Sequence, residues 1–217
     1  MLAVALALSV FAASSLREVF TALARAFEQQ HAGVKVELNF AGSQELRFQI
    51  DNGARADVFA SADTRHMQGI AGAAVFARNV PVLVVPEANP AGIREFSDLP
   101  KAQRIVLGAP EVPIGEYSDA ILAKAPFREQ VMKHVVSREL NVRQVLAKVA
   151  LGEADAAIVY RTDAAAGRGK VRAFDIPGAP LAEYPLAALT ADPLAKEFVA
   201  LVLSPEGRAA LQAAGFQ

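Results

Sequence analysis

Short apolar runs alternate with helical patterns along most of this 217-residue chain, and that alternation restricts its fold more than any other feature. The segment VKVELNF at 34–40 alternates apolar and polar residues, as a half-buried strand does. The apolar positions between Leu16 and Phe27 recur instead at helical spacing. Further strands are expected at 4–13, 56–62, 80–86, 104–110 and 156–160. Strands that alternate with helices predict an α/β fold whose sheets are mainly parallel.

The later helices carry start signals in their sequence. Helices are expected at 118–124, 128–136 and 141–155, with two more at the end of the chain. Asn141 is the expected N-cap of the third, with Val142 as its first helical residue. In the last helix, Ser204 is the expected N-cap and Pro205 the first helical position.

Composition excludes several classes of function. The formal net charge is −1, so the chain lacks the excess of Lys and Arg that nucleic acid requires of a partner. There is no cysteine, which excludes disulfides and thiolate metal sites. The three histidines follow no metal-ligand spacing and are expected to be ordinary surface residues. Residues 2–13 form an apolar stretch too short to span a membrane, consistent with the end of a leader that runs into the first strand.

Polar residues stand where strands give way to helices. In AASSLREV, Ser15 and Glu18 have the spacing of a capping box. In NFAGSQEL, Gly42 permits a tight turn and Ser43 can cap the following helix. Helix starts present unpaired backbone N–H groups and a partial positive charge, so several of them together can hold an anion without Lys or Arg. Such a site contains only donors, which suits a fully deprotonated oxyanion and disfavours hydrogen phosphate.

The same residues also have ordinary structural interpretations. Serine is a common helix cap, so Ser15 and Ser43 each fit a capping role as well as a ligand role. Tyr160, at the end of the strand AAIVY, fits a packing role. Val142 and Ile114 have no polar side chain, and only their backbone could bind. The residues alone lead to an α/β protein with several polar helix starts and name no ligand.

An ordered set of motifs adds more. AASSL, FAGSQEL, VPIGEY, NVRQVLAKVALGEADAAIVYRTDA and SPEGRAALQAAGF follow one another between about Leu8 and Phe216. In that order they resemble the periplasmic molybdate-binding receptors of ABC importers, which are class II periplasmic binding proteins. The resemblance implies two lobes, each a mostly parallel sheet flanked by helices, with the ligand in the cleft between them. Lobe I would comprise residues 1–78 and 185–217, and lobe II residues 79–184.

The resemblance also implies the groups that hold the oxyanion. By motif match these are the hydroxyls of Ser15 and Ser43, the backbone N–H groups of Ile114 and Val142, and the hydroxyl of Tyr160. No side chain would coordinate the metal directly, and no cofactor is implied. Three features depart from the family's pattern: a large Ile114 where a small residue is usual, the acidic Glu116 close by, and a short segment between Met67 and Phe76. We expect Glu116 to lie in the first helical turn and face solvent.

The resemblance implies a non-enzymatic receptor. It would capture molybdate or tungstate outside the cytoplasm, in the periplasm where there is one, and deliver it as a monomer to the membrane subunits of an ABC permease. A receptor for sulfate, thiosulfate or chromate is the alternative within the same class. A hydrolase using Ser15 or Ser43 with Tyr160 or Lys170 would lack both the G-x-S-x-G and the S-x-x-K motif. The effector domain of a transcription regulator would need a DNA-binding domain that this sequence does not contain.

Overall fold

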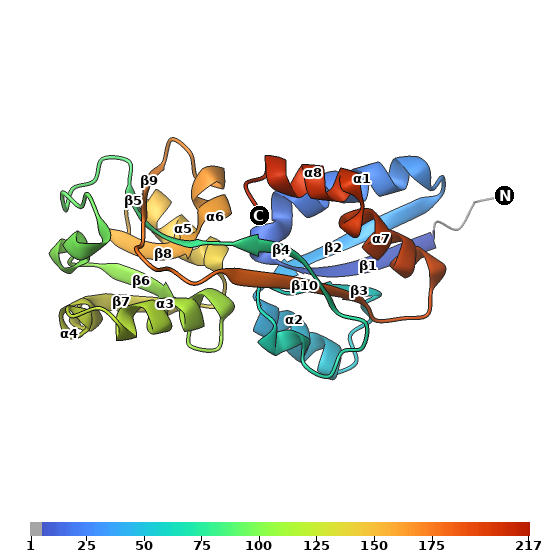
Figure 1. The fold of residues 1–217 in the computed structure, drawn as a ribbon, viewed down its shortest axis with the longest axis horizontal. Coiled ribbons are helices and arrows are strands. Elements are labelled where there is room, and N and C mark those ends of the chain that lie inside the picture. The colour runs from blue at the N-terminus through green and yellow to red at the C-terminus, as the bar shows by residue number, and fades with distance from the viewer. Residues whose placement is uncertain (1–5) are drawn as a thin grey trace. The chain divides into compact units, whose positions relative to one another are not determined.

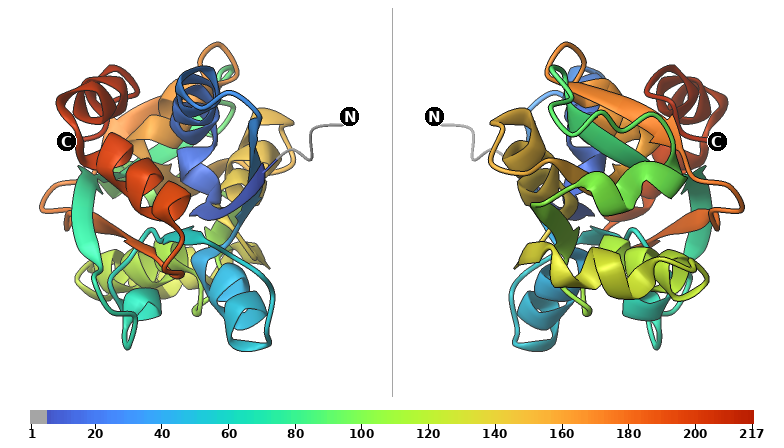
Figure 2. Two further views of the ribbon diagram at one scale, coloured as in Figure 1. Left: turned by 90° about the vertical axis from the view of Figure 1, so that its right-hand side faces the viewer. Right: turned by 90° about the vertical axis from the view of Figure 1, so that its left-hand side faces the viewer.

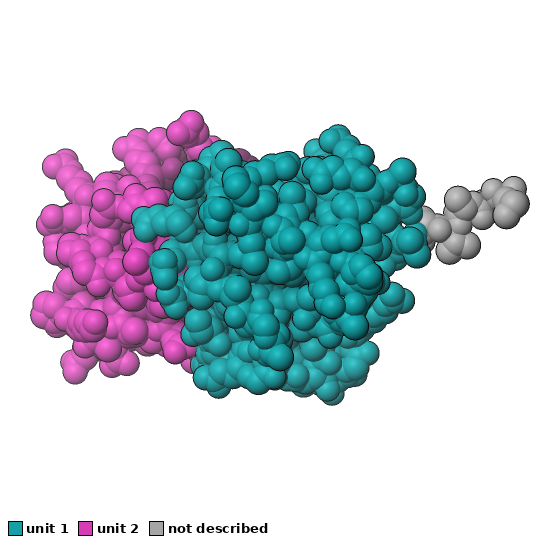
Figure 3. Space-filling model, turned by 45° about the vertical axis from the view of Figure 1, so that its right-hand side comes forward, with its two compact units in different colours: residues 1–78, 183–217 teal, residues 79–182 magenta. Residues whose placement is uncertain are grey.

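The chain forms two compact units in the computed structural model, which describes residues 6–217 (Figure 3). Unit 1 comprises Met1–Arg78 and Glu183–Gln217, and unit 2 comprises Asn79–Ala182. The first two residues of the strand expected at 4–13, and most of the apolar stretch before it, lie outside the described residues. The α/β prediction is confirmed, because each unit contains a five-stranded sheet with flanking helices.

The sheet of unit 1 has the strand order β2-β1-β3-β10-β4. Strand β1 pairs in parallel with both β2 and β3, whereas β10 runs antiparallel to β3. The side chains of Leu8, Val10 and Ala12 on β1 are completely buried, because helices cover the faces of such a sheet. The strands are β1 (Leu6–Ala13), β2 (Val34–Ala41), β3 (Val58–Ala60), β4 (Ala74–Asn79) and β10 (Ala182–Ala188).

Helices cover both faces of this sheet. Helices α1, α7 and α8 pack together on one face, and α2 lies on the other (Figures 1 and 2). The rings of Phe20 and Phe27 on α1 pack edge-on against Phe198 of α7, at centroid distances of 6.1 and 5.4 Å. The helical segments are η1 (Ser14–Leu16), α1 (Arg17–Gln30), α2 (Ser43–Asp51), η2 (Arg65–Met67), α7 (Pro193–Leu203) and α8 (Pro205–Ala213).

The sheet of unit 2 has the strand order β7-β6-β8-β5-β9. Strand β6 pairs in parallel with β7 and β8, while β5 runs antiparallel to β8 and β9. The strands are β5 (Pro81–Pro86), β6 (Ile105–Gly108), β7 (Val135–Glu139), β8 (Ala156–Tyr160) and β9 (Val171–Asp175). The helical segments are η3 (Phe96–Lys101), α3 (Pro113–Ala123), α4 (Arg128–Lys133), α5 (Val142–Ala150) and α6 (Arg161–Ala166). Helix α3 lies on one face of the sheet, and α5 and α6 pack together on the other (Figure 1).

Two expectations about individual elements are wrong. The helix expected at 128–136 ends at Lys133, and Val135 begins strand β7. The carbonyl of His134 accepts a hydrogen bond from the N–H of Ile105 at 2.8 Å, so sheet pairing overrides the helical pattern there. The strands β4, β9 and β10 were not anticipated. The sheets are also mixed rather than mainly parallel, with antiparallel pairs at β3–β10, β5–β8 and β5–β9.

Other expectations are confirmed. Asn141 and Ser204 are the N-caps of α5 and α8, with Val142 and Pro205 as the first helical residues. No helix within residues 6–217 combines the length and apolar character needed to cross a membrane.

Candidate functional site

In unit 1 the two predicted serines lie at the same edge of the sheet. Parallel strands β1 and β2 end at paired residues, Ala13 opposite Ala41. Ser15 and Ser43 each follow two residues later, where the chain turns into a helical segment. The carboxyl ends of parallel strands are the usual position of ligand sites in α/β proteins. The structure therefore places Ser15 and Ser43 at the same edge of the sheet, just after the ends of the neighbouring strands β1 and β2.

Ser15 does not cap a helix. The N-cap of α1 is Leu16, and neither η1 nor α1 has a side-chain cap, so the predicted capping box of Ser15 and Glu18 is wrong. The Ser15 side chain is instead buried, and its Oγ lies 3.0 Å from the hydroxyl oxygen of Tyr184 on β10. A hydrogen bond to a side chain 169 residues away replaces the local bond that the sequence spacing suggested.

Ser43 is also not a cap. It is the first residue of α2, after Gly42 as N-cap, so the capping role predicted for it is wrong. Its Oγ accepts a hydrogen bond of 3.0 Å from the backbone N–H of Ala62, just beyond the end of β3. A backbone N–H can only donate, so this bond leaves the Ser43 proton available for another acceptor. The residue is 1% exposed, and its hydroxyl is held in place rather than rotating in solvent.

The segment after β3 supports Ser43 through a polar cluster that sequence analysis missed. The buried carboxylate of Asp63 accepts bonds from the Ser61 hydroxyl (3.1 Å) and from the backbone N–H of His66 (3.0 Å), and lies 2.9 Å from Nδ1 of that histidine. Burial alone would raise the pKa of Asp63, but the hydrogen bonds from His66 outweigh it and hold the pKa below its usual value. His66 is thus not an ordinary surface residue, because its side chain is only 13% exposed.

In unit 2 three predicted groups share one sheet edge. Adjacent parallel strands β7, β6 and β8 lead into α5, α3 and α6 respectively. Val142 is the first residue of α5, Ile114 the second residue of α3, and Tyr160 the last residue of β8. A helix-start N–H has no acceptor in its own helix, so the edge presents backbone donors beside a tyrosine.

The start of α3 is held tightly against the end of β6. Pro113 occupies the first helical position and has no N–H, so the N–H of Ile114 is the first in the helix. The Ile114 side chain is buried, and its Cγ2 would lie 2.9 Å from a Cβ placed on Gly108. The missing side chain of Gly108 thus makes room for the isoleucine side chain. Glu116 lies in the first turn of α3 and is exposed, as expected.

The start of α5 is fixed by its cap and by an ion pair. The side chain of Asn141 accepts hydrogen bonds from the N–H groups of Arg143 and Gln144, both at 3.1 Å. Arg143 Nε lies 2.6 Å from Oδ1 of Asp163, which is completely buried in the first turn of α6. This pair links α5, which Val142 begins, to α6, which follows Tyr160. It also means that the charge of Arg143 is balanced within unit 2.

Tyr160 is positioned by its strand and by an aromatic neighbour. It is 1% exposed, pairs with Pro81 of β5, and acts as the N-cap residue of α6. The ring of Tyr117, on α3, packs edge-on against it at 6.3 Å between centroids. The packing role predicted for Tyr160 is therefore real, and it leaves a ligand role open.

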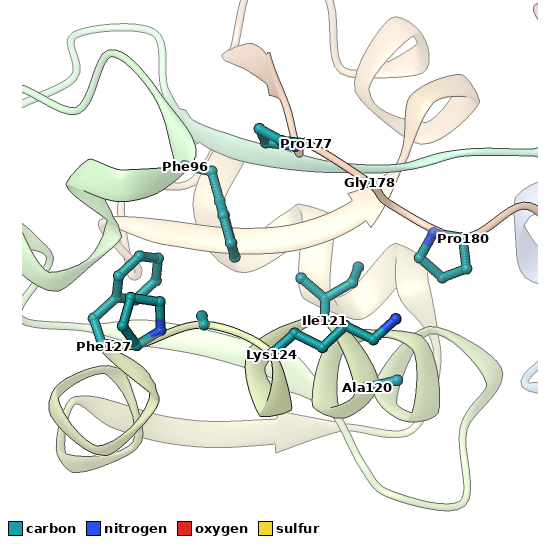
Figure 4. A pocket seen from close by; sticks show the side chains of 10 residues that line it. Phe96, Ala120, Ile121, Lys124, Phe127, Pro177, Gly178 and Pro180 are labelled. Carbon is teal, nitrogen blue, oxygen red and sulfur yellow. The ribbon is translucent and has the colours of Figure 1, made fainter.

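A hollow on unit 2 has the wrong chemistry for an oxyanion. It is lined by the rings of Phe96 and Phe127, by Ile121 and by prolines, with Lys124 as its one charged residue (Figure 4). None of its ten lining residues carries a hydroxyl. It does not overlap the strand ends that carry the predicted donors. Within the described residues, no group of three or more His, Asp or Glu side chains could hold a metal ion.

Comparisons with known proteins agree with this fold. The molybdate-binding protein ModA of Mycobacterium tuberculosis is 40% identical over 220 residues, covering 95% of this chain and 83% of the relative. ModA of Escherichia coli is 32% identical over 199 residues, covering 84% of this chain and 77% of the relative.

Two solved structures share the fold at low sequence identity. The periplasmic molybdate-binding protein of Azotobacter vinelandii has a TM-score of 0.84 at 22% identity, covering 97% of this chain and 98% of that one. The sulfate-binding protein SubI of M. tuberculosis also has a TM-score of 0.84, at 20% identity, covering 97% and 86%. Neighbours named for different anions are thus equally similar, and the structural likeness shows the fold alone. Residues 8–217 match the model for bacterial extracellular solute-binding proteins, and the chain belongs to that family.

Proposed function

We propose that this protein is a receptor for a tetrahedral oxyanion, molybdate or tungstate, held by Ser15, Ser43, Ile114, Val142 and Tyr160. The observation that carries the proposal is the position of all five residues at the carboxyl ends of strands, two on unit 1 and three on unit 2. The relatives named molybdate-binding protein support the choice of anion. The two sets of donors would bind one anion together, and lobe closure would complete the site.

The proposed groups select by hydrogen-bond direction rather than by charge. Hydroxyls with an engaged acceptor and helix-start N–H groups both offer protons, which a fully deprotonated oxyanion can accept at every oxygen. Hydrogen phosphate carries a proton that needs an acceptor and is disfavoured. Sulfate is smaller than molybdate, so a shell fitted to molybdate would leave it with long, weak bonds. Molybdate and tungstate are nearly equal in size, and we expect little discrimination between them.

Isothermal titration of the dialysed protein with molybdate, tungstate, sulfate and phosphate tests this proposal. One-to-one binding of molybdate and tungstate, with sulfate and phosphate much weaker, is the expected result. Binding confined to sulfate, thiosulfate or chromate would keep the family and change the ligand. No heat with any oxyanion, in protein shown to be folded, would refute the proposed function.

Two variants test whether the proposed residues form the binding site. Ser43→Ala and Tyr160→Phe each leave an anion oxygen without its donor, which should cost about 1–3 kcal/mol, or about 5- to 150-fold in affinity. Ser204→Ala is the matched control, because it removes the hydroxyl that caps α8 and should lower stability by about 1 kcal/mol without changing affinity. Wild-type affinity in both test variants would place the site elsewhere.

The remaining parts of the proposal concern the setting. The protein would work outside the cytoplasm as a monomer and pass the anion to the membrane subunits of an ABC permease. Light scattering of the loaded protein tests the monomer, and reconstitution with the permease tests delivery. The receptor would have no catalytic role. Ester hydrolysis that is lost in Ser15→Ala would contradict this.

A further inference from the structure

Tyr184 lies directly behind one of the proposed ligand groups. Its hydroxyl is 3.0 Å from Ser15 Oγ, and both side chains are buried. The ring is 0% exposed and packs edge-on against Phe76 and Phe216, at centroid distances of 6.4 and 5.3 Å. A fully buried ring packed against two aromatic neighbours holds its hydroxyl at a fixed position, so the Ser15 hydroxyl has a fixed partner.

The direction of this hydrogen bond follows from the chemistry of the ligand. A deprotonated oxyanion can only accept, so Ser15 must give it the single hydroxyl proton. Ser15 Oγ then accepts a hydrogen bond from the Tyr184 hydroxyl. Tyr184 thus donates to Ser15, and Ser15 donates to the anion. Ser43 shows the same order, since its Oγ accepts from the Ala62 N–H, which cannot act in reverse.

The partners of Ser15 and Ser43 both come from the end of the β3–β10 strand pair. Strand β10 pairs antiparallel with β3, with Leu186 opposite Ala60, and the bond from Ser61 N–H to the Pro185 carbonyl continues the pairing. The same register places Tyr184 opposite Ala62. The two residues that hold Ser15 and Ser43 therefore come from facing positions at the end of one strand pair.

We propose that Tyr184 is a positioning residue that fixes the Ser15 hydroxyl as a donor to the bound oxyanion. The inference rests on the proposed function, because it needs an anion at Ser15. Without the phenolic hydroxyl, Ser15 can rotate and offer a lone pair instead of a proton. Loss of Tyr184 should then weaken molybdate binding and reduce the discrimination against protonated anions.

A double-mutant cycle measured by molybdate titration tests the proposal. Tyr184→Phe should weaken binding about 3- to 10-fold, since it removes one hydrogen bond behind the ligand. In a Ser15→Ala background the same substitution should change affinity less than about two-fold, whereas in a Ser43→Ala background it should keep its full effect. The Tyr184→Phe variant should also bind phosphate more strongly relative to molybdate. A purely structural role would weaken binding equally in both backgrounds.

The outcomes separate this inference from the proposed function. Wild-type protein that binds no oxyanion refutes the receptor itself. A wild type that binds molybdate, with a folded Tyr184→Phe variant of equal affinity, overturns only the role of Tyr184. Equal losses in the Ser15→Ala and Ser43→Ala backgrounds overturn it as well.

If the Tyr184→Phe variant does not fold, a measurement on the wild-type protein tests the proposal instead. Buried phenolic protons can exchange slowly enough to be seen by NMR. In molybdate-loaded protein the Tyr184 hydroxyl proton should show a cross-peak to the Ser15 side chain. A hydroxyl proton that exchanges with water as rapidly as an exposed one would overturn the proposal.

Discussion

Replacing Gly115 by alanine should weaken both folding and ligand binding, and it can be compared with a second glycine that affects folding alone. Gly115 is the third residue of α3, directly after Ile114, whose N–H is a proposed donor. A Cβ at Gly115 would overlap the carbonyl oxygen of Ala109 and stand 2.7 Å from that of Gly108. Both are backbone atoms that cannot rotate away, so α3 would have to move off the end of β6.

The size of the effect can be worked out for both properties. Overpacking costs about 1–3 kcal/mol, and the better helix propensity of alanine returns up to about 1 kcal/mol. We therefore expect Gly115→Ala to lower the free energy of unfolding by about 1–2 kcal/mol. A hydrogen bond to a charged acceptor contributes about 1.5–3 kcal/mol, so partial loss of the Ile114 bond should weaken molybdate binding about 10-fold.

Gly207 provides the matched control. It is the third residue of α8, after a proline at the first position, and a Cβ there would overlap the carbonyl oxygens of Leu201 and Val202. Gly207→Ala should lower stability by a similar amount and leave affinity unchanged, because α8 carries no proposed donor. Urea unfolding and calorimetric titration of both variants give the two quantities. Wild-type molybdate affinity in folded Gly115→Ala protein would refute the backbone role of Ile114.

Three further predictions concern the supports of the site. Val142→Ala should cost about 1–2 kcal/mol in urea unfolding because it trims a buried side chain, yet change molybdate affinity less than two-fold; a large loss would mean that the side chain, not the N–H, binds. Asn141→Ala should lower stability by about 1 kcal/mol and also weaken binding, since α5 loses its cap; unchanged affinity would show that the cap does not position Val142. Asp63 has a lowered pKa, so its stabilising contribution is complete above about pH 5, one unit above the unfolded pKa, and is lost as the pH falls through the lowered value. Stability should therefore fall less steeply in Asp63→Asn than in wild type between pH 5 and about 3, in urea unfolding at each pH, and equal slopes would contradict the assignment.

Local pattern was enough to predict the fold class and most of the elements. The strand over 34–40 and the helix from Leu16 to Phe27 have clear periods, and they form as β2 and α1. The pattern failed where pairing decides the structure. Val135 and Val136 extend a helical pattern, yet they join β7 because β6 offers a parallel partner. The strands β4, β9 and β10 likewise depend on neighbours distant in sequence.

The site shows the same division between local and distant effects. The positions of Ser15 and Ser43 after strand ends, and of Val142 at the start of a helix, follow from local pattern, and the structure has them there. The partners of these residues cannot be predicted from local pattern. Tyr184 is 169 residues from Ser15 in sequence, and the ion pair of Arg143 with Asp163 joins α5 to α6. A lone tyrosine in a strand carries no signal of such a contact. The capping predictions for Ser15 and Ser43 were wrong for this reason: distant partners replaced the local bond.

The hydroxyls of Ser15 and Ser43 do not cap helices, and this supports the oxyanion proposal more than capping roles would. A capping hydroxyl accepts a hydrogen bond from an N–H of its own helix, and its proton can point in any open direction. Ser15 and Ser43 are instead buried, and each has a partner from the β3–β10 end that fixes where its oxygen lies. Unit 2 reaches the same result by other means, with helix-start N–H groups whose direction the backbone fixes. Because the charge of Arg143 is balanced by Asp163, an anion bound by these groups would be recognised by the direction of their protons rather than by net charge.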